Sequence, residues 1–366
     1  MNQRERLTRL FEKKEIDRVP IWLLNPIDRL GCYVDFFNNP CYSRLVPYVN
    51  DVCDNFNRRH YNQGFCLNAN PEIKQGKKDV TIDGESFSVN CVSYRDLELT
   101  SYSVRTKLGR RTKYRVTDPA ELRKILDIPY VKPKLDISRY SDELARLGGR
   151  GLMMTDIGDA LSPLYSLMSA EDFSLATATD YDLLLEFCDV MCERSLENYR
   201  YLLEHDIGEV FFIVGAEFAG PPIVSPAKFG ELSARYVKRI VDLIREYGKY
   251  SIVHYHGQLR DILDGMAYIA PDALHTIEAP PIGNCTLTEA RAKLGDMILI
   301  GNIQYDDIVR LPRDELYELT KAAVLEAKDG RFILSPTAGP YEPVISDAAI
   351  DNYIAFIEAG LDWGKV

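Results

Sequence analysis

Residues 250-YSIVHYHGQLRDILDGMAYIAPDALHTIE-278 contain the unit that decides the fold. The apolar run 250–256 predicts a strand, 258–269 predicts a helix, and 273–278 predicts a second strand. Both predicted strands are short and almost entirely apolar, which is typical of strands covered on both faces of a parallel sheet. This stretch therefore predicts one strand–helix–strand unit of an α/β protein.

The same alternation continues in both directions along the chain. Five further strands are predicted, at 18–24, 151–157, 209–215, 297–303 and 331–336, and each of the last four is followed by a helical stretch. Such a series predicts a (β/α) barrel or a doubly wound sheet, and the barrel is favoured because no glycine-rich dinucleotide loop follows an early strand. These strands supply seven of the eight in a single (β/α)8 TIM-type barrel. The eighth is expected within 48–106.

A different pattern occupies residues 79–117. Alternating β-branched and aromatic residues are interrupted by turn signals at Asp83-Gly84 and Leu108-Gly109. This pattern predicts a small antiparallel β meander. The whole chain, 1–366, is therefore predicted to be one barrel with a β-rich insertion at about 79–117.

The composition excludes several classes of protein. The net charge of −11 argues against a partner that is a nucleic acid or an anionic membrane. No segment has the roughly 18 consecutive apolar residues of a membrane span, and the charged opening lacks the apolar core of a secretory signal. A cytoplasmic protein with reduced thiols is therefore expected. Cys188 and Cys192 are interpreted as buried packing residues.

Polar residues follow the predicted strands at the point where each one ends, and in a barrel these ends form the active-site face. His254 and His256 are two positions apart, so both imidazoles are expected on one face of their strand. Together with Glu217 they match the ligands of zinc or another divalent transition metal, with one position left open. The remaining strand-end residues are Asp156, Asp159, Glu278, Asn302, Gln304 and Tyr341.

These residues also have ordinary structural interpretations. Histidines at a strand end often bond to carboxylates or backbone, so Glu217 or Glu278 would then only orient them. His275 alternates with Ile277 and is expected to face the helices. The stretch 57-NRRHYNQ-63 could bind an anion through its arginines and histidine, but it is interpreted as a solvated loop.

Several stretches resemble the uroporphyrinogen decarboxylase superfamily. They are 4-RERLTRLFEKKEIDRVPIW-22, 215-GAEFAGPPIVSPAKFGELSARYVKRIVDLI-244, 299-LIGNIQ-304, 331-RFILSPTAGPYEP-343 and 352-NYIAFIEAG-360. The resemblance covers approximately 1–25 and 150–366. It implies a single (β/α) barrel, and it implies that the protein forms a homodimer.

The resemblance points to two branches of this superfamily. The decarboxylases bind substrate carboxylates through an Arg-Gln-Ala-Gly-Arg-Tyr loop, and of its arginines this chain keeps only Arg29. The decarboxylases also have a Phe-Ser-Asp motif, which this chain lacks at the expected place. The corrinoid-dependent methyltransferases bind zinc through His-x-Cys and a later Cys, where this chain has His256 and Thr337 instead of the two cysteines. Nitrogen and oxygen ligands make a harder metal site, which favours a methyl donor or acceptor that carries oxygen.

Three functions therefore remain open. The first is a metal-dependent methyltransferase or O-demethylase that moves a methyl group between a small molecule and a corrinoid partner protein. In it, Glu217 and Glu278 would be catalytic, and no tightly bound organic cofactor is expected. Its substrate would contact Arg29, Asp156, Asn302, Gln304 and Tyr341. The second is cofactor-independent decarboxylation of uroporphyrinogen III or a related carboxylate, and the third is a non-catalytic barrel that binds a corrinoid or another ligand.

Overall fold

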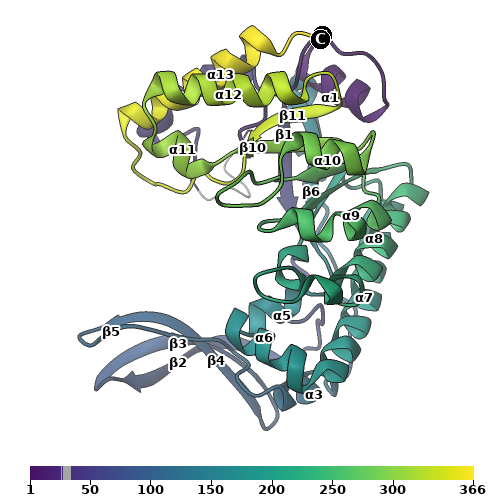
Figure 1. Ribbon diagram of the computed structural model, residues 1–366. Helices are drawn as coiled ribbons and strands as arrows, with labels where there is room; N and C mark the ends of the chain where they lie inside the picture. Colours follow the sequence, from purple (N-terminus) through teal and green to yellow (C-terminus); the bar gives the residue numbers. More distant parts are fainter. Residues whose placement is uncertain (26, 28–33) are drawn as a thin grey trace.

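The computed structural model describes residues 1–25, 27 and 34–366, and its central element is a seven-stranded parallel sheet (Figure 1). The strands lie side by side in chain order, and every neighbouring pair is parallel. They are β1 (Asn55–His60), β6 (Gly151–Gly158), β7 (Val210–Val214), β8 (Tyr250–His254), β9 (Ala273–His275), β10 (Ile298–Ile303) and β11 (Phe332–Pro336). The α/β class and the positions of six predicted strands are confirmed.

Both edges of this sheet are hydrogen bonded to the same short segment, residues 20–22. On one side, Leu334 N–H of β11 donates to the Pro20 carbonyl and Trp22 N–H donates to the Leu334 carbonyl, both at 2.9 Å. On the other side, the N–H of Asp54, just before β1, donates to the Ile21 carbonyl at 2.6 Å. The parallel sheet is therefore curled, with its two edge strands on either side of this segment.

The prediction of a complete strand at 18–24 is wrong. In the described residues this segment forms only isolated bridges, of Arg18 with Lys365 and of Ile21 with Leu334. Pro20 has no N–H to donate, and the Ile21 N–H donates to the Asp54 side chain at 2.9 Å rather than to a backbone carbonyl. The strand that was expected within 48–106 is β1. The structure thus establishes seven parallel strands, not the eight of a complete (β/α)8 barrel.

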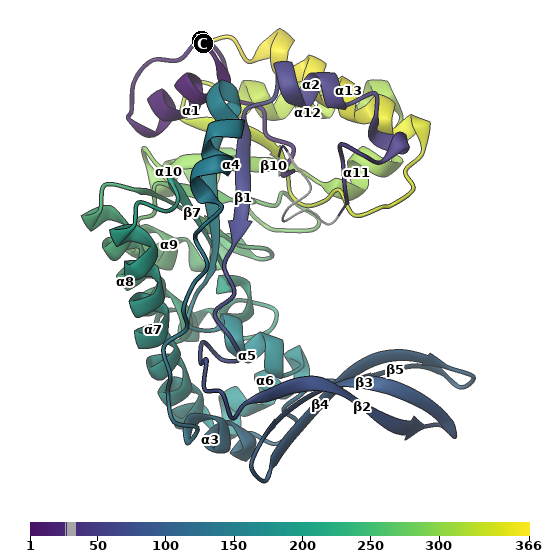
Figure 2. The same cartoon turned by 180° about the vertical axis from the view of Figure 1, so that it is seen from behind.

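Helices cover the outside of the curled sheet (Figures 1 and 2). Leu7, Leu10 and Phe11 of the first helix instead pack into the apolar cluster inside it. The helices are α1 (Gln3–Phe11), α2 (Val46–Asp51), α3 (Ala120–Leu126), α4 (Tyr140–Leu147), α5 (Ser162–Leu167), α6 (Ala170–Thr179), α7 (Tyr181–Glu204), α8 (Arg235–Glu246), α9 (Leu263–Ile269), α10 (Leu287–Leu294), α11 (Tyr305–Arg310), α12 (Arg313–Ala327) and α13 (Asp347–Trp363).

The inside of the curled sheet has an apolar layer with a polar layer above it. Side chains on alternate strand positions form the apolar cluster, in which the Trp22 ring lies 4.8 Å from the Phe56 ring and 6.1 Å from the Phe212 ring, centroid to centroid. Arg58 lies two residues beyond Phe56, on the same face of β1. The equivalent step on β8 leads from Ile252 to His254. On both of these strands, polar groups therefore enter the interior near the carboxyl end.

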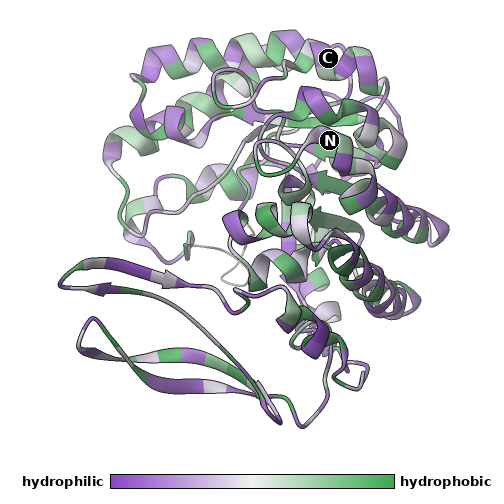
Figure 3. Cartoon of the chain, turned by 60° about the horizontal axis from the view of Figure 1, so that its bottom comes forward, coloured by the Kyte–Doolittle hydropathy of each residue, from purple (hydrophilic) through white to green (hydrophobic). Residues whose placement is uncertain are grey.

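A separate antiparallel sheet confirms the predicted β meander, with its start and end shifted. Its strands, in spatial order, are β2 (Lys74–Ile82), β3 (Glu85–Tyr94), β4 (Leu97–Thr106) and β5 (Gly109–Lys113). The sheet extends away from the parallel sheet in Figures 1 and 2, and its strands carry both hydrophilic and hydrophobic residues in Figure 3. Buried side chains at its base, including Val92 and Leu99, pack against the main core.

Two predictions from composition can be compared with the structure. Cys188 and Cys192 are fully buried in the core, which confirms their packing role, and burial raises the pKa of the Cys192 thiol to about 11. Among the helices of the described residues, none has the length and apolar content needed to cross a membrane.

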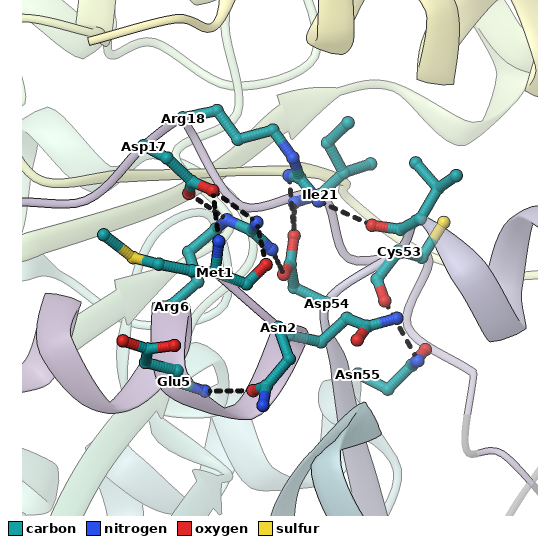
Figure 4. Close-up of polar contacts among 12 residues, drawn as sticks. Met1, Asn2, Glu5, Arg6, Asp17, Arg18, Ile21, Cys53, Asp54 and Asn55 are labelled. Carbon is teal, nitrogen blue, oxygen red and sulfur yellow. Dashed lines mark hydrogen bonds and ion pairs between the residues drawn. The ribbon is translucent and has the colours of Figure 1, made fainter.

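Asp54 is a buried carboxylate that joins three segments (Figure 4). Its side chain accepts hydrogen bonds from Arg6 of α1 at 2.6 Å, from Arg18 at 2.8 Å and from the Ile21 N–H at 2.9 Å. Burial raises the pKa of Asp54, and the positive charges of Arg18 and Arg6 oppose that rise. With two guanidinium groups this close, we infer that the carboxylate is ionised at neutral pH.

We expect Asp54→Ala to be strongly destabilising. Removal of the carboxylate leaves the largely buried Arg18 without this counter-charge and leaves Arg6 with Asp17 alone, and the loss of a buried partner costs about 3–5 kcal/mol in comparable pairs. The matched control is Asp351→Ala, which removes an exposed ion pair with Arg44 and should cost about 0–1 kcal/mol. Urea unfolding of both variants measures this difference, and equal losses would contradict the role assigned to Asp54.

The ion pair between Asp17 and Arg6 predicts that the folded protein loses stability in acid. Hydrogen bonds from Arg6 at 2.6 and 2.9 Å lower the pKa of this carboxyl in the folded protein. A lowered folded-state pKa gives stability that is present above the unfolded-state pKa of about 3.9 and is lost as the pH falls below it. Between about pH 5 and pH 2, the wild type should therefore lose more stability than Asp17→Asn. Parallel pH profiles of thermal unfolding would contradict this account.

Candidate functional site

The polar layer inside the curled sheet contains two stacked histidines. His254, at the end of β8, has its Nδ1 atom 2.7 Å from Nδ1 of His275, at the end of β9, and their ring centroids are 4.9 Å apart. The Nε2 atom of His275 lies 3.2 Å from the carbonyl oxygen of Pro336, at the end of β11. These contacts connect the carboxyl ends of three strands.

The contacts of this pair determine which nitrogen carries each proton. The Pro336 carbonyl only accepts, so His275 donates through Nε2–H, and its Nδ1 is a lone-pair acceptor when the ring is neutral. His254 must then donate its Nδ1–H to His275, which leaves the His254 Nε2 atom unprotonated. Burial lowers the pKa of both rings, that of His275 to about 3, so both are neutral at pH 7. His254 therefore presents a fixed lone pair at Nε2.

His256 lies beside this pair and belongs to a second network. The ring centroids of His256 and His254 are 4.5 Å apart. Nδ1 of His256 is 3.1 Å from Glu278 Oε1, and the N–H of Gly257 donates to Glu278 Oε2 at 2.8 Å. Burial alone would raise the pKa of Glu278, but the hydrogen bonds from His256 and Gly257 and the amide of Gln304 lower it. Glu278 is thus an ionised carboxylate that orients His256.

Gln304 extends this second network to β11. The hydroxyl of Thr337 donates to Gln304 Oε1 at 3.0 Å, and Gln304 is the residue before α11. Its Nε2 atom is buried without a hydrogen bond of normal geometry among the described residues, although the amide lies close enough to affect Glu278. The predicted residues His256, Glu278 and Gln304 are therefore brought together.

Glu217 and Asp159 form an acidic pair next to the histidines. Glu217 lies in a short 3-10 turn after β7 (Ala216–Ala219), and its Oε2 atom accepts from the Gly215 N–H at 3.1 Å. Burial raises the pKa of Glu217, while the charge of His256 lowers it. Burial and then the charge of Glu217 raise the pKa of Asp159 to about 7. Burial therefore disfavours the charged forms of both carboxyl groups.

Arg58 is a site residue that the sequence analysis missed. From β1 it forms a two-pronged ion pair with Asp156 of β6, with nitrogen–oxygen distances of 2.9–3.1 Å, and its guanidinium lies 5.0 Å from the centre of the Phe212 ring. Its charge is among the causes that lower the pKa of His254, after burial and the other two histidines. The predicted Asp156 is therefore paired with a cation inside the sheet.

The structure corrects two further expectations. The stretch 57–63 is not a solvated loop, because its first residues lie in β1 and the buried Arg59 pairs with Glu143 at 2.6 Å. His275 does not face the helices. It is 1 % exposed and faces His254, because β9 ends at His275 and the alternation used for the prediction does not continue to Ile277.

The other predicted substrate residues are less closely associated with this cluster. Asn302 lies on β10 beside Ser335 of β11. Tyr341 is 47 % exposed, and its ring packs against Tyr305 with centroids 5.3 Å apart. Arg29 lies outside the described residues. The proposed contacts of these three residues with a substrate stay predictions.

The predicted metal ligands fit a metal ion in part. His254 and His256 both use Nδ1 for a neighbour, and metal-bound histidines typically have their second nitrogen held in this way. As the side chains stand, the described part of the chain contains no group of three or more His, Cys, Asp or Glu residues arranged to hold a metal ion. The two imidazoles are thus pre-oriented, and a third ligand such as Glu217 would have to move towards them.

A comparison with protein-family models identifies the family. Residues 150–362, from β6 to α13, match the model described as uroporphyrinogen decarboxylase (URO-D). The chain belongs to the uroporphyrinogen decarboxylase family. The matched part includes both histidine networks, whereas Arg58 on β1 lies outside it.

Comparison with solved structures supports the fold. A methyltransferase from Methanosarcina mazei is 16% identical with a TM-score of 0.61, and the match covers 99% of each chain. A D-psicose 3-epimerase from Clostridium cellulolyticum H10 is 12% identical with a TM-score of 0.32, covering 63% of this chain and 92% of the other, which is too weak to support an argument. The comparison with curated proteins found no match.

The tautomer of His254 is directly measurable. In metal-free protein labelled with 15N-histidine, we expect His254 to be neutral at pH 7 with its proton on Nδ1, and His275 to be neutral with its proton on Nε2. The chain has five histidines, so single substitutions can assign each ring. His275→Ala removes the acceptor of the His254 Nδ1–H, so His254 should no longer prefer to carry its proton on Nδ1. His205→Ala, on the surface, should leave the His254 tautomer unchanged. A proton on Nε2 of His254 in the wild type would contradict the arrangement.

Proposed function

We propose that this member of the uroporphyrinogen decarboxylase family is a methyl-transfer enzyme that moves a methyl group between a small molecule and a corrinoid partner protein. The observation that carries the proposal is the contact of His254 Nδ1 with His275, which by our tautomer assignment leaves Nε2 of His254 free, beside a second oriented imidazole, His256. Membership of the family and a shared fold with a protein named as a methyltransferase support the same direction.

We include a divalent transition metal, such as zinc, in this proposal. His254, His256 and Glu217 would hold it, and it would act as a Lewis acid on an oxygen or sulfur atom in its open position. With this ligand set it would have no thiolate ligand, so the site would be harder than a sulfur-rich one. We therefore favour a methyl donor or acceptor that reacts through oxygen.

The protein's own groups have separate roles in this proposal. His275 fixes the His254 ring, and Glu278 fixes the His256 ring. The partly buried Glu217, whose pKa is raised by burial, is suited to accept or return a proton at the reacting atom. The Arg58–Asp156 ion pair supplies a fixed, balanced pair of charges beside the Phe212 ring.

Decarboxylation of uroporphyrinogen III has less support. Eight substrate carboxylates need several fixed cations, and the interior arginine of the described site, Arg58, is already paired with Asp156. Incubation of the protein with uroporphyrinogen III should therefore release no carbon dioxide. Release at a catalytic rate would favour the decarboxylase instead.

The metal proposal predicts about one bound ion per chain, lost when either imidazole is removed. His254→Ala and His256→Ala should each reduce the bound metal to near zero after zinc loading and desalting. His205→Ala is the matched control, because His205 is exposed, follows the last residue of α7 and contacts the Tyr201 carbonyl of that helix rather than the candidate site. Elemental analysis measures the ratio, and wild-type protein that cannot be loaded would contradict metal binding.

The methyl-transfer proposal is tested with methylcobalamin as a surrogate for the corrinoid partner. The protein should accelerate loss of the cobalt-bound methyl group in the presence of hydroxyl- or thiol-bearing acceptors, and the change is followed by visible absorbance. Glu217→Gln keeps the shape but removes the carboxylate, so we expect its rate to fall about 100-fold or more. A protein that binds cobalamin without turnover would instead be a binding barrel.

A further inference from the structure

A cavity opens near the acidic pair, between the carboxyl ends of β1 and β6 and helix α7. Its volume is about 230 Å3. Four of its lining residues carry hydroxyl groups, Ser162 and Ser166 of α5 and Ser195 and Tyr199 of α7. Asn62 and Gln63, which follow β1, add side-chain amides. The wall is therefore rich in uncharged hydrogen-bonding groups.

Part of this hydrogen-bonding capacity is unused. Ser195 is fully buried, and its hydroxyl makes no hydrogen bond of normal geometry, although it lies beside the phenol of Tyr199. Tyr199 itself donates to the Gly158 carbonyl at 2.7 Å and accepts from the Gly158 N–H at 3.1 Å. Asn198, next to Tyr199 in α7 but not part of the lining, is also fully buried, and neither end of its amide is bonded among the described residues. Buried polar groups normally have partners, so this region is suited to receive a polar guest.

The charge of the lining limits what this guest can be. None of the described lining residues is a lysine or an arginine. Asp159 is the only carboxylate among them, and the exposed His60 at the cavity mouth is the only histidine. Asp159 Oδ1 is already occupied by the N–H groups of Leu161 and Ser162, both at 2.9 Å, and by the Ser162 hydroxyl at 3.2 Å. A ligand with a carboxylate or phosphate would find no fixed cation here. An uncharged ligand with several hydroxyl groups matches the lining.

The cavity is connected to the proposed metal site through one residue. Asp159 lines the cavity and packs against Gly215 so closely that a β carbon there would collide with its carboxylate. The N–H of Gly215 in turn donates to Glu217 at 3.1 Å. The cavity thus adjoins the Glu217 side of the cluster. Its volume is below the roughly 300–1,000 Å3 that is usual for drug-sized ligands.

We propose that this cavity binds the methyl-group donor or acceptor of the reaction, and that this substrate is a small, uncharged compound with several hydroxyl groups. The substrate assignment rests on the proposed function, whereas the binding itself does not. The unbonded Ser195 hydroxyl holds the substrate, and the absence of lysine and arginine from the described lining excludes anionic analogues of the same size.

The test compares neutral and charged probes. The probes are myo-inositol, its monomethyl ether, gluconate and choline, and binding is measured by ligand-observed NMR with the full-length protein. We expect saturable binding of the two neutral probes and at least about tenfold weaker binding of the charged ones, since each tenfold corresponds to about 1.4 kcal/mol. Equal or tighter binding of gluconate or choline, or no binding of either neutral probe, would overturn the proposal.

Three variants locate the binding. Ser166→Phe, from an exposed position on the cavity wall, should abolish binding by filling the space, whereas Ala170→Phe, on an exposed position outside the wall, should not. Ser195→Ala should weaken binding by roughly three- to tenfold without lowering the thermal unfolding midpoint, because no protein hydrogen bond of normal geometry is lost. Unchanged binding in Ser166→Phe would overturn the proposal.

These results are distinguishable from failure of the proposed function, because binding needs neither metal nor turnover. If the neutral probes bind in the cavity but the protein does not demethylate methylcobalamin, then the cavity assignment holds and methyl transfer is wrong. If methyl transfer occurs and Ser166→Phe leaves both binding and turnover unchanged, then the cavity is not the substrate site.

Discussion

The buried carboxylate of Asp54 is the contact on which the arrangement of the site depends. It holds Arg6 of α1, Arg18 and the backbone of Ile21 at once, immediately before β1 begins. These bonds fix the segment 20–22 between the two edge strands of the curled sheet. They also fix the start of β1, and Arg58 lies only four residues further on. The interior position of Arg58 therefore follows from a contact at the opposite end of its strand.

The site combines an apolar base with polar groups whose orientation is fixed by neighbours. Burial keeps His254 and His275 neutral, and their mutual hydrogen bond then decides which nitrogen is free. Glu278 has the opposite state, because its hydrogen bonds outweigh the effect of burial and keep it ionised. The same interior thus holds neutral imidazoles and an ionised carboxylate a few residues apart. Neutral imidazoles and an ionised carboxylate are suited to bind a cation or to hold a reacting atom. The methyl-transfer proposal uses them in these two roles.

The sequence predicted the strands that have strong apolar runs. Strands β6, β7, β8, β10 and β11 lie within a residue or two of their predicted limits, because burial on both faces demands such runs. The strand β1 was not recognised, since NFNRRH contains two arginines and a histidine whose ion pairs only the folded structure supplies. His275 was assigned to the wrong face because the end of the three-residue strand β9 could not be predicted. The networks around His256 depend on contacts between four strand ends, which spacing along the chain does not reveal.

Our central proposal is that a divalent metal ion would be bound by His254, His256 and Glu217, through nitrogen and oxygen and not through sulfur. X-ray absorption of the zinc-loaded protein tests it most directly. We predict zinc–nitrogen or zinc–oxygen distances of about 2.0–2.1 Å with an imidazole scattering pattern that is reduced in His254→Ala. A shell at about 2.3 Å, the distance of a zinc–sulfur bond, would contradict the claim, and so would zinc without imidazole ligands.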